Sequence, residues 1–572
     1  MAQDDQSQKP VIIIGHGLAG LVAAYELSKQ GVPALIVDQE NSSNVGGQAF
    51  WSLGGLFCVN SANQRRLGVK DSRELAMADW FGSAGFDRKE DYWPRQWAEA
   101  FVNFATDELE NYVKGLGAGF FNVGWAERGA GLADGHGNSV PRFHMTWGTG
   151  PEVVRIFLEP VRAAEKKGLV EFKHRHQIDQ LIVDEKTGKA VGIRGTILED
   201  DDAPRGVKSS RKAAGEFEIL GSAVLITTGG IGGNVEAVKA AWPLERLGPK
   251  VPEHFVLGVP AHVDGRMQGI AEASGASLIN RDRMWHYTEG LKNWNPVWDN
   301  HGIRVLPAPS SLWLDATGKR LPPFLYPGTD TLATLKYICS TGYDYTWFIT
   351  DRAIVSREFA LSGSEQNSDI TDKSIWGVLT QRVFGTKGTI PVQNFMKYGE
   401  DFVVRDNLDD LVAGMNELAK SSGRGPELDL ADIRRTVELR DIQMDNPYSK
   451  DAQAMLIHNA RNYWSDKKMR VAPPHRLQDT AKNGPLIAVR MNLLTRKSLG
   501  GIETNLKSNV LRTDGSEFPS LYAAGEVAGF GGGGVHGYNA LEGMSPLFLL
   551  SPVLPRTVVS TPSCMPLEYS IC

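Results

Sequence analysis

Cysteine is scarce in this chain of 572 residues, with only Cys58, Cys339, Cys564 and Cys572 present. No two of them lie at the Cys-x-x-Cys spacing of zinc clusters and iron–sulfur clusters, so both kinds of site are excluded. So few thiols in so long a chain also argue against a disulfide framework. We expect no bound metal.

Long apolar runs and a strong charge of one sign are also missing. No stretch of 18 or more apolar residues occurs, so no membrane-spanning helix is expected. The polar first ten residues lack the basic start of a signal peptide, and a cytoplasmic location is expected. The net charge of −6 argues against a nucleic-acid backbone or an anionic membrane surface as the main partner.

Glycine, in contrast, is abundant: 62 residues, above the usual share of about 7%. The first glycines follow a β-branched run at 11–14, in the turn GHGLAG at 15–20, before a helix over 21–30 and a strand over 34–37. In this arrangement Gly15 permits the tight turn, Gly17 lets the backbone approach a pyrophosphate, and Gly20 allows close helix–strand packing. The helix N-terminus favours the pyrophosphate, and Asp38 is placed to bind ribose hydroxyls. The unit therefore predicts dinucleotide binding.

Three further glycine-rich segments lie far apart in the chain. They are VGGQAFWSLGG at 45–55, TTGGIGGN at 227–234 after the apolar run 223–226, and LYAAGEVAG at 521–529. Strands that end in glycine at such distances indicate one nucleotide-binding fold interrupted by insertions. A length of 572 residues favours two or three domains.

Together these segments resemble the FAD-dependent fumarate reductase and 3-ketosteroid dehydrogenase superfamily, from about residue 10 to about residue 543. The similarity is closest to its "FAD-binding dehydrogenase" branch, through WAERG at 125–129, GHGNSVPRFH at 135–144, HVDGRM at 262–267, DRMWHYTEG at 282–290 and FGGGGVHGYNALEG at 530–543. The resemblance implies an α/β fold, a doubly wound Rossmann-like FAD domain with an inserted α+β cap domain. It divides the chain into the first part of the FAD domain (9–262), the cap with linkers (263–469), the C-terminal part of the FAD domain (470–543) and a divergent irregular tail (544–572).

The same resemblance implies which residues contact FAD. Toward the pyrophosphate and ribose these are Gly15, Gly17, Ala19, Gly20 and Asp38, and along the ribityl chain and flavin they are Gly46, Gly47, Gln48, Ala49, Gly54 and Gly55. Gln177, Thr228, Gly229 and Gly230 would border the adenine, Gly525 and Glu526 the ribityl chain, and Asn539 and Leu541 the pyrimidine edge of the flavin. Gln48 stands where membrane succinate dehydrogenases have a flavin-linked histidine, so the FAD should be non-covalent.

The residues that clamp a dicarboxylate in fumarate reductases are replaced. Gly328 stands at the position of the proton-donor arginine, Lys497 at that of the substrate histidine and Ala540 at that of a clamp arginine. Because a carboxylate needs cationic partners to leave water, these replacements disfavour fumarate. The late loop also departs from the ketosteroid dehydrogenase pattern, with Gly534-Val535-His536-Gly537-Tyr538 in place of a YPGxGG motif.

What the resemblance retains is a shared chemistry, the transfer of hydride between flavin N5 and a carbon next to an activating carbonyl. The expected substrate is apolar and possesses a ketosteroid-like carbonyl, with aromatic walls from 283–287 and an unknown electron acceptor. Tyr538, His536 and Lys497, with Arg496 beside it, are the candidate catalytic residues. Two alternatives stay open: a fumarate-reductase-like enzyme acting on a small carboxylate, and a flavin-binding protein without turnover.

The second alternative arises from the tail. Relatives continue after residue 543 into a glycine-rich helix that points at the flavin, whereas Pro552 and Pro555 would stop a helix here after a short run. We therefore expect the segment 544–572 to be irregular.

Overall fold

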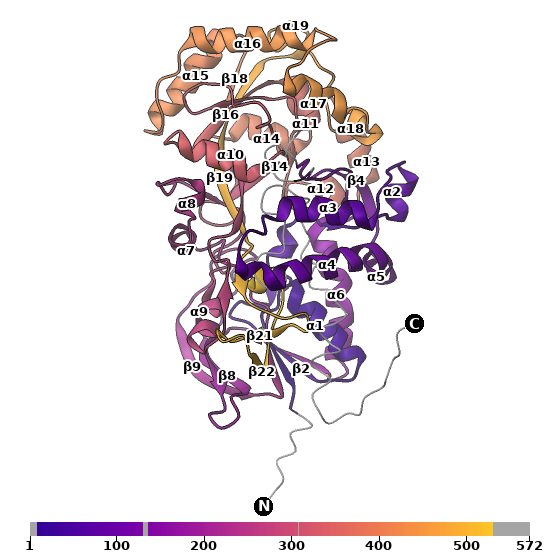
Figure 1. Ribbon diagram of the computed structural model, residues 1–572, viewed down its shortest axis with the longest axis vertical. Helices are drawn as coiled ribbons and strands as arrows, with labels where there is room; N and C mark the ends of the chain where they lie inside the picture. Colours follow the sequence, from indigo (N-terminus) through magenta and orange to yellow (C-terminus); the bar gives the residue numbers. More distant parts are fainter. Residues whose placement is uncertain (1–8, 130–134, 136, 307, 530–572) are drawn as a thin grey trace, which may run out of the picture.

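The computed structural model describes residues 9–129, 135, 137–306 and 308–529. Two large sheets lie one above the other along the long axis of the molecule, with the N-terminal unit in the lower half (Figure 1). The predicted residues His536, Tyr538, Asn539 and Leu541, and the tail 544–572, lie outside the described residues. Within the described ranges, no helix is long and apolar enough to cross a membrane.

The lower sheet has the strand order β21-β22-β10-β1-β2-β6. Its strands are β1 (Val11–Ile14), β2 (Ala34–Val37), β6 (Val170–Lys173), β10 (Ala223–Ile226), β21 (Asn509–Leu511) and β22 (Glu517–Ala523). All pairs are parallel except β21 with β22. From β1 the chain adds β2 and β6 on one side and later β10 and β22 on the other, which is the topological switch point of a doubly wound sheet. The predicted Rossmann-like fold is confirmed.

Both faces of this sheet are covered, which explains why β1 is apolar throughout. Val11 and Ile13 pack into the cluster formed with α1 (Leu18–Lys29) and α6 (Thr149–Glu165). Ile12 and Ile14 pack on the opposite face, against the antiparallel sheet of β7 (His176–Val183), β8 (Ala190–Leu198) and β9 (Ala213–Leu220). A strand buried on both faces needs no polar alternation.

The upper sheet has the order β15-β16-β19-β13-β14-β17, and β11 and β18 also pair with β19. Its strands are β11 (Val256–Leu257), β13 (Met284–Lys292), β14 (Gly302–Leu306), β15 (Leu312–Asp315), β16 (Tyr345–Asp351), β17 (Ala360–Leu361), β18 (Phe402–Arg405) and β19 (Leu486–Ser498). The helices of this half are α10 (Thr331–Ser340), α11 (Arg352–Glu358), α12 (Ser368–Thr371), α13 (Ile375–Val378), α14 (Ile390–Tyr398), α15 (Leu408–Ser421), α16 (Leu430–Met444), α17 (Ala452–Ala460) and α18 (Trp464–Met469).

The 13-residue strand β19 is the axis of this upper sheet. It pairs with β13, β16 and β18 on antiparallel registers and with β11 on a parallel one. Hydrogen bonding therefore crosses the expected boundaries after residues 262 and 469, because β11 precedes the first and β19 follows the second. The division of the chain into domains stays a prediction.

Smaller elements connect the two halves. The strands are β3 (Gly55–Phe57), β4 (Phe120–Gly124) and β5 (Phe143–Thr146) in one sheet and β12 (Leu278–Ile279) with β20 (Gly501–Ile502) in another. The helices are α2 (Ala62–Arg66), α3 (Arg73–Ala84), α4 (Tyr92–Asp107), α5 (Leu109–Gly115), α7 (Val235–Ala240), α8 (Leu244–Leu247), α9 (Arg266–Ala273) and α19 (Thr480–Asn483).

Candidate active site

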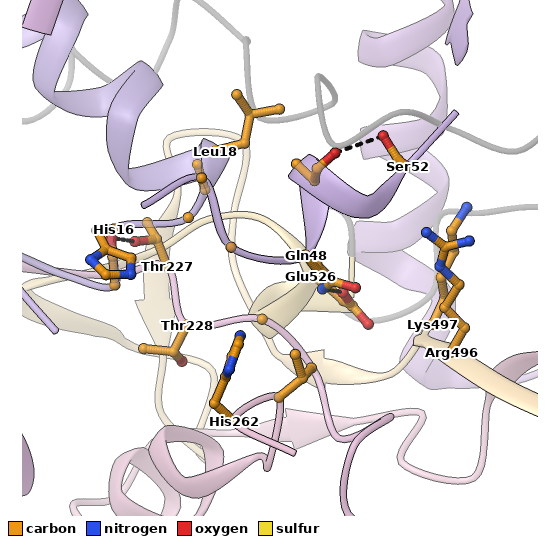
Figure 2. A pocket seen from close by; sticks show the side chains of 18 of the residues that line it. His16, Leu18, Gln48, Ser52, Thr227, Thr228, His262, Arg496, Lys497 and Glu526 are labelled. Atoms are coloured by element: carbon orange, nitrogen blue, oxygen red, sulfur yellow. Dashed lines mark hydrogen bonds between the residues drawn. The ribbon is translucent and has the colours of Figure 1, made fainter. Parts of the chain in front are cut away.

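A cavity with an empty volume of about 1590 Å³ opens at the carboxyl ends of β1 and β10 and extends to the upper sheet (Figure 2). It is lined by the first glycine turn, the loop 46–55, the residues after β10, and side chains from β13, β14 and β19. Segments that are far apart in the chain therefore meet around one cavity.

The first glycine turn is held tightly against β10. Gly15 has a φ of +105°, a conformation that glycine adopts without strain. The Thr227 hydroxyl donates to the carbonyl oxygens of Ile14 at 2.8 Å and Gly15 at 3.0 Å. Gly17 begins α1 without a side-chain cap, so its free backbone N–H groups face the cavity. This is the geometry of an anion site at a helix N-terminus.

Asp38 lies at the end of β2, beside this turn. Its carboxylate accepts hydrogen bonds from the backbone N–H groups of His16 and Glu40, both at 2.8 Å. Burial raises the pKa of Asp38, while these two donors oppose the shift. Burial also lowers the pKa of His16 to about 3 and lowers that of His262, so both rings are neutral near pH 7. This end of the cavity is polar without an excess of positive charge.

The second glycine loop packs directly on the first. Gly46 and Gly47 have φ values of +99° and +54°, and a Cβ on Gly47 would lie 3.2 Å from the Cα of Gly17. The N–H of Gly46 donates to the carbonyl of His16 at 3.0 Å. Further along, Gly54 lies against the backbone of Thr149 at the start of α6. The two loops form one cradle at the mouth of the parallel sheet.

Gln48 and Glu526 meet in the middle of the cavity, although 478 residues separate them in the chain (Figure 2). The amide of Gln48 donates to one carboxylate oxygen of Glu526, and the backbone N–H of Ser498 donates to the other at 2.9 Å. Burial raises the pKa of Glu526 to about 7. The contact joins the second glycine loop, the end of β19 and the segment after β22.

Charged residues of the upper sheet gather at the other end of the cavity, away from His16. The guanidinium of Arg304, on β14, lies 3.9 Å from the centre of the Tyr287 ring. It pairs with Glu127 and lies 3.8 Å from Glu289. Burial raises the pKa of Glu127 to about 7, although Arg304 opposes the shift. Burial lowers the pKa of Lys497, and the phenol of Tyr287 opposes that change.

Most of the predicted residues in the described part line this one cavity. They are Gly15, Gly17, Ala19, Asp38, Gly46, Gly47, Gln48, Ala49, Gly54, Gly55, Thr228, Gly229, Glu526 and Lys497. Gly20, Gln177, Gly230 and Gly525 are not in the wall. Gly20 supports the turn from behind, and the neighbour of Gln177, Ile178, reaches the wall in its place. The individual roles of these residues stay predictions.

Several residues of the wall were not predicted from the sequence. Arg304, His262 and Arg266 were given no role, and Tyr287 was assigned only to an aromatic wall. None of them belongs to a glycine motif. The pairing of β13 with β14 could have indicated that Tyr287 and Arg304 lie close, but this pairing depends on strands that the sequence pattern did not delimit.

Comparison with known proteins identifies the family of this chain. Residues 10–545 match the model of a family described as an FAD binding domain. The chain belongs to this FAD-binding family. It is an FAD-dependent oxidoreductase acting on CH–CH groups.

Three known proteins show what this chain is similar to. The chain is 57% identical over 534 residues to a KsdD-like steroid dehydrogenase of Mycolicibacterium smegmatis, covering 93% of this chain and 95% of the relative. Among solved structures, it resembles a 3-ketosteroid Δ1-dehydrogenase from Sterolibacterium denitrificans at TM-score 0.63 and 14% identity, covering 97% and 100% of the two chains. A flavocytochrome c3 fumarate reductase is similar at TM-score 0.60 and 19% identity, covering 96% and 78%. The two structural likenesses concern the fold.

The residues of the cavity fit the cofactor of the family. A Cβ on Gly47 would lie 3.2 Å from the Cα of Gly17, so glycine at position 47 keeps space open beside the start of α1 for a diphosphate. Among the described residues, the buried Nδ1 atom of His16 has no hydrogen-bond partner, so it can serve a ligand beside Asp38. His16 and Asp38 would suit the adenosine of FAD and the start of α1 its diphosphate, and this placement stays a prediction.

Proposed function

We propose that this oxidoreductase dehydrogenates, or in reverse reduces, the carbon–carbon bond beside the carbonyl of an apolar, 3-ketosteroid-like compound. The 57% identity over nine tenths of the chain to relatives named KsdD-like steroid dehydrogenases is the observation that carries the proposal. The meeting of the glycine loops with side chains of the upper sheet around one cavity supports it. Non-covalent attachment of FAD, inferred from Gln48, is part of the same proposal.

The charged end of the cavity supports a role for Tyr287 as proton acceptor. Dehydrogenation removes one hydrogen as a proton, and bound FAD supplies the hydride-accepting chemistry for the other. Tyr287, Arg304 and Lys497 all line this end of the cavity, and the guanidinium of Arg304 lies 3.9 Å from the centre of the Tyr287 ring. In this proposal Tyr287 takes the substrate proton, and Lys497 holds positive charge beside it.

A small dicarboxylate is a poorer fit to the same residues. Arg304 does line the cavity, but it is already paired with Glu127 and lies close to Glu289. A dianion placed there would face two buried carboxyl groups as well as one guanidinium. This supports a ketone over fumarate as the substrate. Tyr538 and His536, outside the described residues, stay candidates for polarising its carbonyl.

The experiment is anaerobic reduction of the flavin, followed by absorbance near 450 nm. Ketosteroids should bleach the wild-type flavin, and succinate should not. Tyr287→Phe should lower the bleaching rate by about 100-fold or more, because loss of a general base costs ~10²–10⁴-fold. Tyr345→Phe, a buried tyrosine of the same sheet, is the matched control. Bleaching by succinate alone, or by no donor at all, would overturn the proposal.

A further inference from the structure

Four large apolar side chains are exposed on one short segment of the upper half. Ile375 is 66% exposed, Trp376 78%, Phe384 75% and Ile390 57%. They extend from α13, through the π-helical turn Leu379–Val383, to the first residue of α14. We call these four residues the apolar patch. Clustered exposure of this kind on a folded protein marks an interaction surface.

The apolar patch is held in place by polar contacts beneath it. The N–H of Ile390 donates to the side-chain oxygen of Gln381 at 2.9 Å, which ties the end of the segment to its middle. Arg382 forms a two-pronged ion pair with Asp369, at 2.6 and 2.8 Å. The exposed side chains therefore project from a fixed base.

Exposed positive charge borders the apolar patch, although the whole chain is acidic. Lys373 and Arg382 are neutralised by Glu152 and Asp369. The exposed charges of the segment 371–398 are then Lys387 and Lys397 against Asp372. At physiological salt, charges interact over only about 8–10 Å. The local charge therefore influences which surface the apolar patch binds more than the net charge of −6 of the whole chain does.

A neighbouring helix extends the same composition. Helix α18 packs against the π-helical turn, and α13 and α18 lie at the same edge of the upper half (Figure 1). Trp464 of this helix is 61% exposed, and Lys467 and Lys468 are exposed beside it. Tryptophan and phenylalanine flanked by lysine are the side chains that proteins insert at the surface of anionic bilayers.

The segment that displays the patch also continues into the cavity wall. Ser362 lines the cavity, and Asn367 donates to the carbonyls of Leu361 and Gly363, which fixes the short link to α12. Helix α12 then contacts α6 through the 2.8 Å bond between Thr371 and Thr149. The patch is thus structurally continuous with the walls that receive the substrate.

We propose that the apolar patch docks the enzyme on an anionic lipid surface, from which an apolar substrate enters the cavity. The exposed apolar side chains and the neighbouring exposed lysines are the evidence for docking. The delivery of substrate rests on the proposed function. A second copy of the chain is the competing occupant. Positive charge on both partners would disfavour that pairing, whereas it favours anionic lipid.

The test is cosedimentation of the full-length, FAD-loaded protein with lipid vesicles. Vesicles of phosphatidylcholine with about one-third phosphatidylglycerol should bind the wild type, and vesicles of phosphatidylcholine alone should bind it more weakly. The double variant Trp376→Ser, Phe384→Ser should bind the anionic vesicles at least about tenfold more weakly than the wild type, because it loses the inserted side chains. Lys387→Glu should weaken binding to the anionic vesicles only.

A matched control carries Tyr92→Ser and Leu220→Ser, two exposed apolar residues of α4 and β9, and should bind as the wild type does. The docking proposal is wrong if the wild type does not bind anionic vesicles, or if the Trp376→Ser, Phe384→Ser variant binds them as well as the wild type does. It is also wrong if the wild type is a dimer that the patch variant converts to monomer without any vesicle binding. If the protein binds anionic vesicles but ketosteroids do not bleach its flavin, the docking surface is supported and the proposed function is rejected. The two proposals can therefore fail separately.

Discussion

Burial controls the protonation of several histidine side chains, and the sequence alone does not reveal this burial. His16, His144 and His286 have pKa values lowered to about 3, 4 and 3, in each case mainly by burial. The ring of His286 lies 4.9 Å from that of Trp242, and its Nδ1 atom has no hydrogen-bond partner among the described residues. These histidines are neutral near pH 7, and His286 behaves as an aromatic core residue.

Replacing His286 by phenylalanine should make the protein more resistant to acid. Between pH 6.5 and about 3 the unfolded chain binds a proton on His286 that the folded chain does not. The free energy of unfolding of the wild type therefore falls as the pH is lowered through this window. At pH 5 the variant should retain about 2 kcal/mol that the wild type has lost since pH 7. Urea unfolding at both pH values measures the difference.

His458→Phe, at an exposed position of α17, is the control substitution for this experiment. Equal slopes for wild type and His286→Phe would show that burial does not suppress protonation at this position.

The glycines and Asp38 could be predicted from sequence because a diphosphate admits few backbone geometries, and those geometries require glycine at fixed spacing. Arg304 and His262 could not, because any side chain of suitable size can line an inner wall, and Tyr287 could be expected only as part of the aromatic wall 283–287. Only the pairing of β13 with β14 and β19 brings Tyr287 beside Arg304 and Lys497.

Among the elements, the junction of β1 with α1 is sensitive to the addition of a single carbon atom at Gly20. A Cβ on Gly20 would collide with the carbonyl oxygen of Gly15 and lie 3.1 Å from the Thr227 hydroxyl. Gly20→Ala should push α1 away from the turn and weaken FAD binding by about tenfold or more, equivalent to about 1.4 kcal/mol. Titration of the cofactor-free protein with FAD, followed by flavin fluorescence, measures the loss.

Gly119→Ala serves as the comparison, because a Cβ there has no atom within 4 Å. It should bind FAD as the wild type does. Unchanged affinity in Gly20→Ala would mean that the turn tolerates a shift of α1.

The strands that end in glycine, β1 and β10, were identified from sequence because they are short, β-branched and followed by forced turns. The upper sheet was expected only as an α+β cap. Its strand β19 pairs with segments that begin 200 residues earlier, and no local pattern encodes such pairings.

At the scale of the whole molecule, the cofactor site joins segments from across the chain. The cavity wall takes residues near positions 15, 47, 228 and 526. A ligand that binds only the folded state stabilises it by about 2.7 kcal/mol at a concentration 100 times its Kd. FAD should therefore raise the melting temperature of the cofactor-free protein, whereas FMN, which lacks the adenosine that Asp38 is proposed to hold, should raise it much less. Thermal unfolding with each flavin distinguishes them, and equal shifts would contradict an adenosine site at β2.

Acid precipitation gives a second test of how the whole protein holds its cofactor. With Gln48 beside Glu526 and no histidine at that position, we propose no covalent link. The precipitate should be colourless and the supernatant yellow. A yellow precipitate would require another attachment residue.

The strand β19 gives the two halves a common mechanical element. Its middle is the centre of the upper sheet, while its last residues supply Arg496 and Lys497 to the cavity and anchor Glu526 through the N–H of Ser498. A shift of the upper sheet along β19 would therefore displace Arg496, Lys497 and the N–H donor of Glu526 together, so the charged end of the cavity and the support of Glu526 depend on one strand.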